Sequence, residues 1–274
     1  LPTFRDFKYG PVAGMDELRK GLANENLGYS KDNFVITNGA SEALDLALRS
    51  IGKPNDKILL HTPYYYSYKP MVEFNHMKPL FMSTTEGKID VQSFEEQVHD
   101  ARAVLINSPS NPTGRVQDIK TLKIIEKMTK DLDIPLISDE VYKDLIYERE
   151  NYKLSGPHVI TVNSFSKTFA MCGFRVGYLF SNDQNIVNDV IDIKTHSSMN
   201  TNILGQEMAK HALTAPKSFV DEQVKIWKKR RDLIYKRIKE LGLEVDKPEG
   251  AFYILPTVDK PKEFVMDMYK KHNV

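Results

Sequence analysis

One lysine, Lys167, stands between two phenylalanines in the segment SFSKTFAMCGFRVGY, residues 164–178. An ammonium group among apolar side chains is unfavourable unless it is paired, deprotonated or used chemically. The same segment carries Ser164 and Ser166 beside the lysine, and Arg175 further on. An amphipathic surface turn would explain these residues taken alone. A reaction centre built on the lysine amine is the alternative, and it requires partners from elsewhere in the chain.

A carboxylate and an amide are candidates for these partners. Asp139 follows the apolar run IPLIS in the segment SDEVY, which also carries Tyr142. A carboxylate at the end of a buried strand is costly unless a cation meets it, although Asp139 would need no ligand if it capped a helix. Asn111, in SPSNPTG, precedes a proline, which holds its backbone extended and fixes the direction of its side chain. A generic turn would also explain this segment.

Two further segments offer backbone amides and aromatic rings. NGASEA places Gly39, Ala40 and Ser41 at the start of a predicted helix, where free amides attract anions and phosphate in particular. An ordinary turn is the alternative, and the chain has no Walker-type phosphate loop. TPYYYSY holds four tyrosines, of which Tyr65 could stack on a flat ring or simply pack under a loop.

The elements that must position these residues alternate between short apolar strands and amphipathic helices, as in a sheet built from βα units. Strands are predicted at 33–37, 57–61, 78–82, 103–107, 134–138, 159–163 and 175–180, and helices at 41–51, 118–132 and 217–241. Ser41 is the predicted N-cap of the first helix. Several strands are apolar throughout, as parallel strands covered on both faces are. The candidate residues follow these strands, so we expect them at one edge of the sheet.

The C-terminal part has a different pattern. LEVDKPEGAFYIL reads as strand, turn and strand. Residues 262–272 are predicted to form a last helix with Phe264, Val265 and Met268 directed inward.

Length and composition fit an α/β protein with two domains. The 274 residues, of which 41% are hydrophobic, can bury a large core. We expect a three-layer αβα large domain at 10–225 with a mostly parallel seven-stranded sheet. A small α+β domain, incomplete at its C-terminus, is expected at 226–274, and residues 1–9 could belong to it.

Charge and cysteine content exclude several function classes. The 38 basic and 37 acidic residues give a net charge of +1, which disfavours nucleic acid as the main partner. The single cysteine, Cys172, excludes a disulfide framework and a cysteine-rich zinc site, and we expect it to be a small buried residue. No apolar run reaches the roughly 18 residues that cross a bilayer, and no signal-peptide pattern occurs. We predict a cytoplasmic protein without a metal site or a membrane partner.

Together, KYGPVAG (8–14), SPSNPTG, SDEVY and SFSKTFAMCGFRVGY resemble the class I/II aminotransferases, which are pyridoxal-phosphate enzymes of fold type I. The resemblance is to the aspartate and aromatic aminotransferases and runs from about Tyr9 to about Leu255. It implies transfer of an amino group between an α-amino acid and a 2-oxo acid by a ping-pong Schiff-base mechanism.

The resemblance also implies a role for each candidate residue. Lys167 would form the Schiff base with pyridoxal 5'-phosphate and later move the proton at the substrate α-carbon. Asp139 would pair with the pyridine nitrogen, and Asn111 and Tyr142 would hydrogen-bond the ring hydroxyl oxygen. Tyr65 would stack on the ring. The phosphate would be held by Gly39, Ala40, Ser41, Ser164, Ser166 and Arg175, and by Tyr9 of the neighbouring subunit in a homodimer.

Some alternatives remain open. Carbon–sulfur lyases and related eliminating enzymes of the same fold share these cofactor residues. A non-catalytic pyridoxal-phosphate-binding regulatory module is an alternative of another class. Aspartate, aromatic and branched amino acids are all compatible as substrates.

One expected residue is missing. Relatives that act on α-amino acids bind the substrate carboxylate with an arginine well after the GAFY segment, and none of the ten arginines lies there. The chain shown begins with Leu1 and ends soon after the last predicted helix. We therefore expect it to be part of a longer protein.

Overall fold

A computed structural model describes residues 8–273 of the chain. Residues 1–7, which the sequence could assign to the small domain, lie outside the described part. Among the described helices, none combines the length and the apolar character that crossing a membrane requires.

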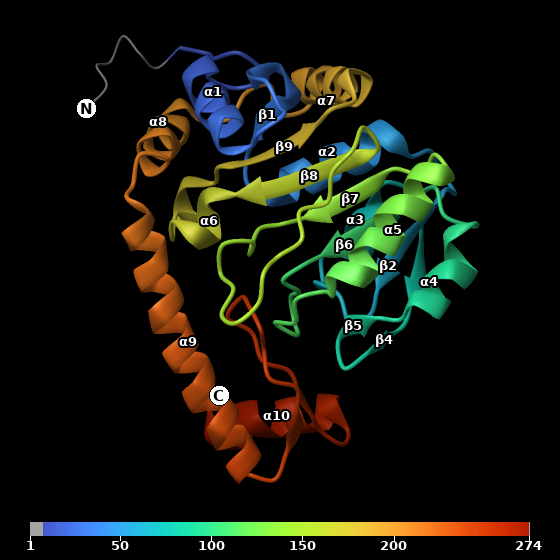
Figure 1. The fold of residues 1–274 in the computed structure, drawn as a ribbon, viewed down its shortest axis with the longest axis vertical. Coiled ribbons are helices and arrows are strands. Elements are labelled where there is room, and N and C mark those ends of the chain that lie inside the picture. Colours follow the sequence, from blue (N-terminus) through green and yellow to red (C-terminus); the bar gives the residue numbers. More distant parts are fainter. Residues whose placement is uncertain (1–7, 274) are drawn as a thin grey trace.

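A seven-stranded sheet forms the centre of the molecule, with the strand order β1-β9-β8-β7-β6-β2-β3 (Figure 1). Strand β9 runs antiparallel to both of its neighbours, β1 and β8, and the other pairs are parallel. The strands are β1 (Phe34–Thr37), β2 (Lys57–His61), β3 (Lys78–Met82), β6 (Ala103–Asn107), β7 (Leu136–Asp139), β8 (Val159–Ser164) and β9 (Gly177–Ser181). The predicted seven-stranded, mostly parallel sheet is confirmed.

Helices cover both faces of this sheet and give three layers (Figure 1). Side chains alternate along each strand, so that Ile58 and Leu60 of β2 pack on one face and Leu59 on the other. The first face is covered by α2 (Ala40–Ile51), α3 (Tyr68–Phe74) and α7 (Gln184–His196). The second is covered by α1 (Asp16–Glu25), α4 (Val91–Val98), α5 (Ile119–Asp131) and α8 (Ile203–Ala212).

Short elements complete this part of the chain. They are η2 (Lys31–Asn33), β4 (Thr84–Thr85), β5 (Lys88–Ile89), α6 (Phe165–Thr168) and η3 (Cys172–Phe174). Two local predictions are wrong here. Gly39, not Ser41, is the N-cap of α2. Arg175 does not begin a strand, because it follows η3 in a left-handed conformation with φ of 54° and β9 starts only at Gly177.

The long helix α9 (Lys217–Glu240) leads away from the sheet to the C-terminal elements (Figure 1). These are β10 (Glu244–Val245), its antiparallel partner β11 (Pro256–Thr257), and α10 (Pro261–His272). The predicted strand within GAFYIL is wrong. Its backbone is instead bonded to loops of the sheet-bearing part: Gly250 N donates to Gly114 O, and Ala251 N donates to Leu145 O.

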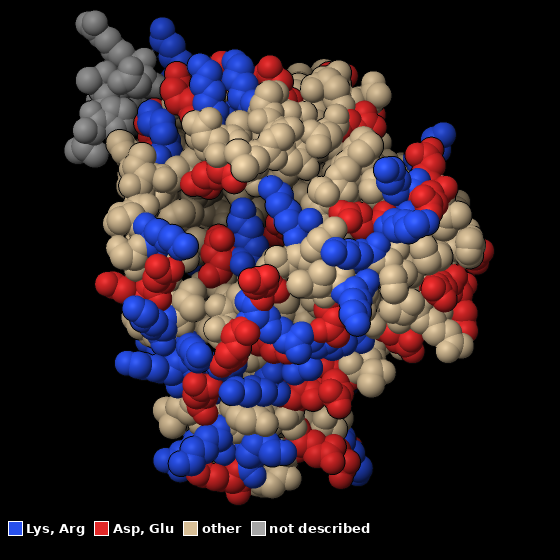
Figure 2. All heavy atoms as spheres, in the orientation of Figure 1, with Lys and Arg blue, Asp and Glu red and all other residues tan. Residues whose placement is uncertain are grey.

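The predicted inward face of α10 is wrong at Phe264 and Val265, whereas Met268 is half-buried. Phe264 is 42% exposed and Val265 is 60% exposed. The neighbouring β10–β11 ribbon has two residues in each strand, which is too small to cover a helix of twelve residues. On the face drawn in Figure 2, basic and acidic side chains of the described residues are interspersed and form no large area of one sign.

Candidate active site

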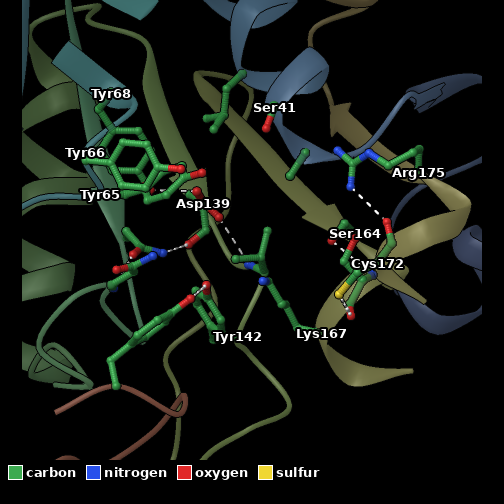
Figure 3. Close-up of a pocket in the computed structure, with 17 residues that line it drawn as sticks. Ser41, Tyr65, Tyr66, Tyr68, Asp139, Tyr142, Ser164, Lys167, Cys172 and Arg175 are labelled. Atoms are coloured by element: carbon green, nitrogen blue, oxygen red, sulfur yellow. Dashed lines mark hydrogen bonds between the residues drawn. The ribbon is translucent and has the colours of Figure 1, made fainter. Parts of the chain in front are cut away.

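A cavity of about 560 Å³ lies at the edge of the sheet where the parallel strands end (Figure 3). Strand register brings its residues together, because Asn107 at the end of β6 pairs with Asp139 at the end of β7. Every predicted site residue lines this cavity except Gly39 and Tyr9. The lining residues are Ala40, Ser41, Leu44, Tyr65, Tyr66, Tyr68, Asn107, Asn111, Asp139, Val141, Tyr142, Ser164, Ser166, Lys167, Cys172, Arg175 and Tyr253.

Asp139 places a buried carboxylate in the cavity. Its Oδ2 accepts a hydrogen bond of 2.6 Å from the hydroxyl of Tyr68, and its Oδ1 accepts one of 3.2 Å from Val141 N. A turn rather than a helix follows it, so the helix N-cap alternative is wrong. Burial raises the pKa of Asp139 to about 6, although the Tyr68 hydrogen bond opposes this shift. Because Asp139 has no ion pair within residues 8–273, a cation entering the cavity would stabilise its ionised form.

Lys167, on the short helix α6, places an amine in the same cavity. Its Nζ lies 5.7 Å from the ring centroid of Tyr142 and 5.4 Å from that of Phe252. No side chain in the described part of the chain forms a hydrogen bond or an ion pair with this amine. The flanking Phe165 and Phe169 pack into the core below α1 instead, so the aromatic surroundings predicted for the amine come from other segments. The amine is therefore available to a ligand.

The opposite corner of the cavity is built to hold an anion. The first amides of α2 have no partners within the helix, and Ala40 and Ser41 line this corner, where the positive end of the helix dipole favours an anion. Ser164 Oγ accepts a hydrogen bond from Ser166 N at 3.2 Å, which turns both serines toward the cavity. Arg175 donates to Cys172 O at 3.1 Å and has no carboxylate partner among the described residues. A doubly charged group such as phosphate fits these donors.

Gly39 lies next to the guanidinium of Arg175. Its φ is +80°, and a Cβ added there would lie 2.3 Å from Arg175 Nη2. The backbone thus needs glycine both for its conformation and for the close approach of the guanidinium. Gly39 contributes to the site by leaving room for Arg175, although it does not line the cavity itself.

Asn111 is held by a buried network that sequence reasoning missed. Asn107, which is 1% exposed, accepts from Asn111 N at 2.7 Å and donates to Asp139 O at 3.0 Å. His61 is fully buried, and its Nε2 accepts from Asn107 N at 3.3 Å. Burial lowers the pKa of His61 to about 4, which keeps the imidazole neutral. Asn107 therefore connects two predicted site residues, and its position at the end of a predicted strand was the signal that could have identified it.

Two tyrosines were also missed. Tyr68 is fully buried and donates to Asp139, and it belongs to the tyrosine-rich segment after β2. Tyr253 reaches the cavity from the segment after α9, and its hydroxyl lies 2.7 Å from that of Tyr142. Nothing in the GAFY segment alone indicates this contact, because it joins residues that are 111 positions apart.

Cys172 differs from its prediction, whereas the role predicted for Tyr9 concerns a neighbouring subunit. Cys172 is exposed and lines the cavity, so the prediction of a buried cysteine is wrong. Tyr9 is 84% exposed and lies at a second, open cavity that Asn38, Ser198 and Asn200 also line. Within one chain, Tyr9 is therefore separate from the main cavity. Among residues 8–273, no cluster of three His, Cys, Asp or Glu side chains forms a candidate metal site.

The sequence model of the family described as "Aminotransferase class I and II" matches residues 5–274. The chain belongs to this family. The probable aspartate aminotransferase of Methanocaldococcus jannaschii is 36% identical over 266 residues, which cover 92% of this chain and 71% of that protein. The aspartate/prephenate aminotransferase of Thermus thermophilus is 31% identical over 90% of this chain and 68% of its own length.

Solved structures agree with this assignment. The aromatic aminotransferase from Pyrococcus horikoshii has a TM-score of 0.92 and 33% identity, over 98% of this chain and 78% of that chain. A double mutant of the Thermus thermophilus aspartate aminotransferase has a TM-score of 0.89 and 30% identity, over 92% of this chain and 70% of that chain. The predicted family and fold type I are therefore confirmed. An aminotransferase is favoured over the lyase and the regulatory module, because these relatives are aminotransferases.

Proposed function

We propose that this aminotransferase binds pyridoxal 5'-phosphate in the 560 Å³ cavity and moves an amino group between an α-amino acid and a 2-oxo acid in two half-reactions. One observation carries the proposal. The cavity brings together the amine of Lys167, the buried carboxylate of Asp139, neither of which forms an ion pair within residues 8–273, and an anion-binding corner at Arg175. The cofactor, when bound, supplies an aldehyde and a ring that accepts electrons from the substrate α-carbon.

Lys167 would hold the cofactor covalently through its amine. With substrate in the cavity, the Lys167 amine would act as a general base and then as a general acid on the α-carbon proton. The rings of Tyr142 and Phe252 flank the amine and would help to orient it.

Asp139 would keep the ring nitrogen protonated. Because burial raises the pKa of this carboxyl to about 6, against its two hydrogen bonds and the charge of Lys167, a protonated ring nitrogen facing it would further favour the ionised form. Tyr68 would hold the carboxylate in place through its hydrogen bond to Oδ2. The pairing is reciprocal, since a carboxylate that stays ionised raises the basicity of the nitrogen it faces.

The remaining lining residues would orient the ring and the phosphate. Asn111 and Tyr142 would donate to the ring hydroxyl oxygen, and Tyr65 would stack on the ring. The phosphate would bind Ser41, Ser164, Ser166, Arg175 and the amides at Ala40, with Gly39 leaving room for the guanidinium. The planar guanidinium of Arg175 suits a phosphate because it can donate two parallel hydrogen bonds.

The proposed substrate rests on the names of the relatives, and the proposed homodimer rests on the exposure of Tyr9. Relatives are named aspartate, aspartate/prephenate and aromatic-amino-acid aminotransferases, so we propose an acidic or an aromatic amino acid as the amino donor. We propose a homodimer in which the exposed Tyr9 serves the neighbouring site. The division into domains at 10–225 and 226–274 and the cytoplasmic location remain predictions. The first is supported by the path of α9 and the second by the single cysteine.

The test compares the absorbance of the purified protein with and without added pyridoxal 5'-phosphate, for wild type and for Lys167→Ala. Wild type should develop the visible band of covalently bound cofactor, and single amino acids should discharge it in a half-reaction without a 2-oxo acid. Lys167→Ala should lose the band, and amino-group transfer should fall at least about 100-fold. Lys127→Ala, at an exposed lysine on α5, is the matched control. A wild-type protein that stays colourless with added cofactor would falsify the proposal.

A further inference from the structure

A pair of hydroxyls joins the C-terminal part of the chain to the proposed cofactor site. The hydroxyl oxygens of Tyr142 and Tyr253 are 2.7 Å apart, and either group can donate. The two rings meet edge to face, with centroids 5.5 Å apart and an interplanar angle of 88°. Both residues line the main cavity, but the proposed function uses only Tyr142.

Tyr253 is held in place by its own segment. Glu249 N and Gly250 N both donate to Gly114 O, and Ala251 N donates to Leu145 O at 2.7 Å. Phe252 packs against Trp227 of α9, with ring centroids 4.9 Å apart. The hydroxyl of Tyr253 is therefore positioned by backbone hydrogen bonds on one side and aromatic packing on the other.

The number of hydrogens in this pair limits what each hydroxyl can do. Burial raises the pKa of both tyrosines above the ordinary value, so each hydroxyl keeps its single hydrogen at neutral pH. If Tyr142 donates to Tyr253, it has no hydrogen left for a ligand. If Tyr253 donates to Tyr142, the hydrogen of Tyr142 is free to point at the ligand, and the hydrogen bond it makes is strengthened by the one it accepts.

We propose that Tyr253 is a positioning residue that donates to the oxygen of Tyr142 and so directs the only hydrogen of Tyr142 toward the ring oxygen of the cofactor. This inference rests on the proposed function, because it assumes that Tyr142 contacts that oxygen. Tyr253 acts through Tyr142 and need not touch the cofactor itself.

The experiment is a pH titration of the absorbance of the cofactor-loaded protein. It compares wild type with Tyr142→Phe, Tyr253→Phe, the double variant and Tyr269→Phe. Tyr269 lies on α10 and is 66% exposed. Tyr269→Phe is therefore the matched control, because it also removes one tyrosine hydroxyl. A donor facing the ring oxygen favours its anionic form, so losing that donor should move the spectral midpoint to higher pH.

Tyr142→Phe should raise the midpoint, and Tyr253→Phe should raise it by roughly 0.1 to 0.3 pH unit, because the bond from Tyr142 to the ring oxygen remains and loses only the strengthening that it receives from Tyr253. The double variant should match Tyr142→Phe alone, since Tyr253 has nothing to act on once the hydroxyl of Tyr142 is gone. Tyr269→Phe should match wild type. A Tyr253→Phe midpoint equal to wild type overturns the inference, as does a shift that adds fully to that of Tyr142→Phe.

A second replacement keeps the test decisive if Tyr253→Phe does not fold. A site-specific fluorinated tyrosine at position 253 keeps the ring and the hydroxyl but is a stronger hydrogen-bond donor. It should move the midpoint to lower pH, and an unchanged midpoint overturns the inference. A wild-type protein without a cofactor band contradicts the proposed function instead, so the two failures are distinguishable.

Discussion

Asp139 shows how burial and ligand chemistry oppose each other at a single residue. The carboxyl is 4% exposed and accepts hydrogen bonds from Tyr68 and Val141 N, yet burial still raises its pKa to about 6. The free protein thus holds an acid whose ionised form is less stable than that of an exposed aspartate, even with the charge of Lys167 nearby. This cost is expected to favour binding of a positively charged ring.

The raised pKa of Asp139 predicts how stability depends on pH in the cofactor-free protein. Between pH values of about 4 and 6, the folded state binds more protons at this site than the unfolded state does, so the free energy of unfolding should fall as the pH rises. The contribution is complete below the unfolded pKa and is lost as the pH passes the folded pKa. A pKa change from 3.8 to about 6 corresponds to about 3 kcal/mol.

Urea unfolding at several pH values checks this prediction. Asp139→Asn stays neutral, so the stability of wild type relative to this variant should decrease by about 3 kcal/mol between pH values of about 4 and 7. Asp221→Asn, at an exposed position on α9, is the control. Added pyridoxal 5'-phosphate should suppress the wild-type decline. A stability difference that does not change with pH would contradict the assignment.

The residues that could be predicted from the sequence share one property. Asp139, Asn111 and Lys167 each follow a strand that is apolar in the sequence, so strand ends alone place them at one edge. Tyr253 could not be found in this way. Its position depends on how the segment after α9 packs against the sheet-bearing part, and no local sequence pattern predicts that packing.

At the scale of elements, the turn between β1 and α2 depends on the loop that carries Arg175. A Cβ added to Gly177 would lie 2.5 Å from Gly39 C, and one added to Gly39 would lie 2.3 Å from Arg175 Nη2. The helix N-terminus and the arginine therefore form one unit. Strand and helix periodicity predicted α2 correctly, whereas the left-handed backbone at Arg175 follows from this close packing and not from residue type.

Replacing Gly39 by alanine tests that unit. Gly39→Ala should displace the guanidinium of Arg175 and weaken cofactor binding by about 10- to 100-fold, the expected cost of losing charged hydrogen bonds. Gly28→Ala is a matched control, because Gly28 has a φ of +89° and nothing within 4 Å of its added Cβ. Both variants place alanine at a positive φ, which is strained, but only the Cβ of Gly39→Ala reaches Arg175. Equal cofactor dissociation constants in a spectroscopic titration would rule out this role for Gly39.

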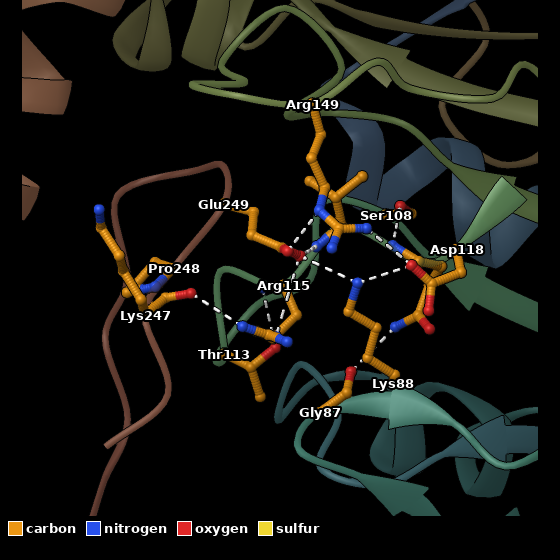
Figure 4. A network of polar contacts seen from close by, with 12 residues as sticks. Gly87, Lys88, Ser108, Thr113, Arg115, Asp118, Arg149, Lys247, Pro248 and Glu249 are labelled. Carbon is orange, nitrogen blue, oxygen red and sulfur yellow. Dashed lines mark hydrogen bonds and ion pairs between the residues drawn. The ribbon is translucent and has the colours of Figure 1, made fainter.

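At the scale of the whole molecule, Glu249 connects the C-terminal segment to the sheet-bearing part (Figure 4). Its carboxylate meets Lys88 Nζ at 3.2 Å and Arg149 Nε at 2.5 Å, and it accepts from Val116 N at 3.1 Å. Arg115 adds a hydrogen bond to Lys247 O at 3.0 Å. These contacts fix the position of the segment that carries Phe252 and Tyr253.

Glu249→Gln should therefore affect both stability and the site. The side chain of Glu249 is 13% exposed, so its loss of charge should lower the free energy of unfolding by about 1 to 3 kcal/mol. Glu263→Gln is the control, because Glu263 is 73% exposed and its pair with Lys260 should be worth less than about 1 kcal/mol. If Glu249 also holds Tyr253 in register, only Glu249→Gln should raise the spectral midpoint of the bound cofactor, as Tyr253→Phe does. If Glu249→Gln lowers stability but leaves the spectral midpoint unchanged, Glu249 stabilises the fold without positioning Tyr253. The backbone hydrogen bonds of the segment would then position Tyr253.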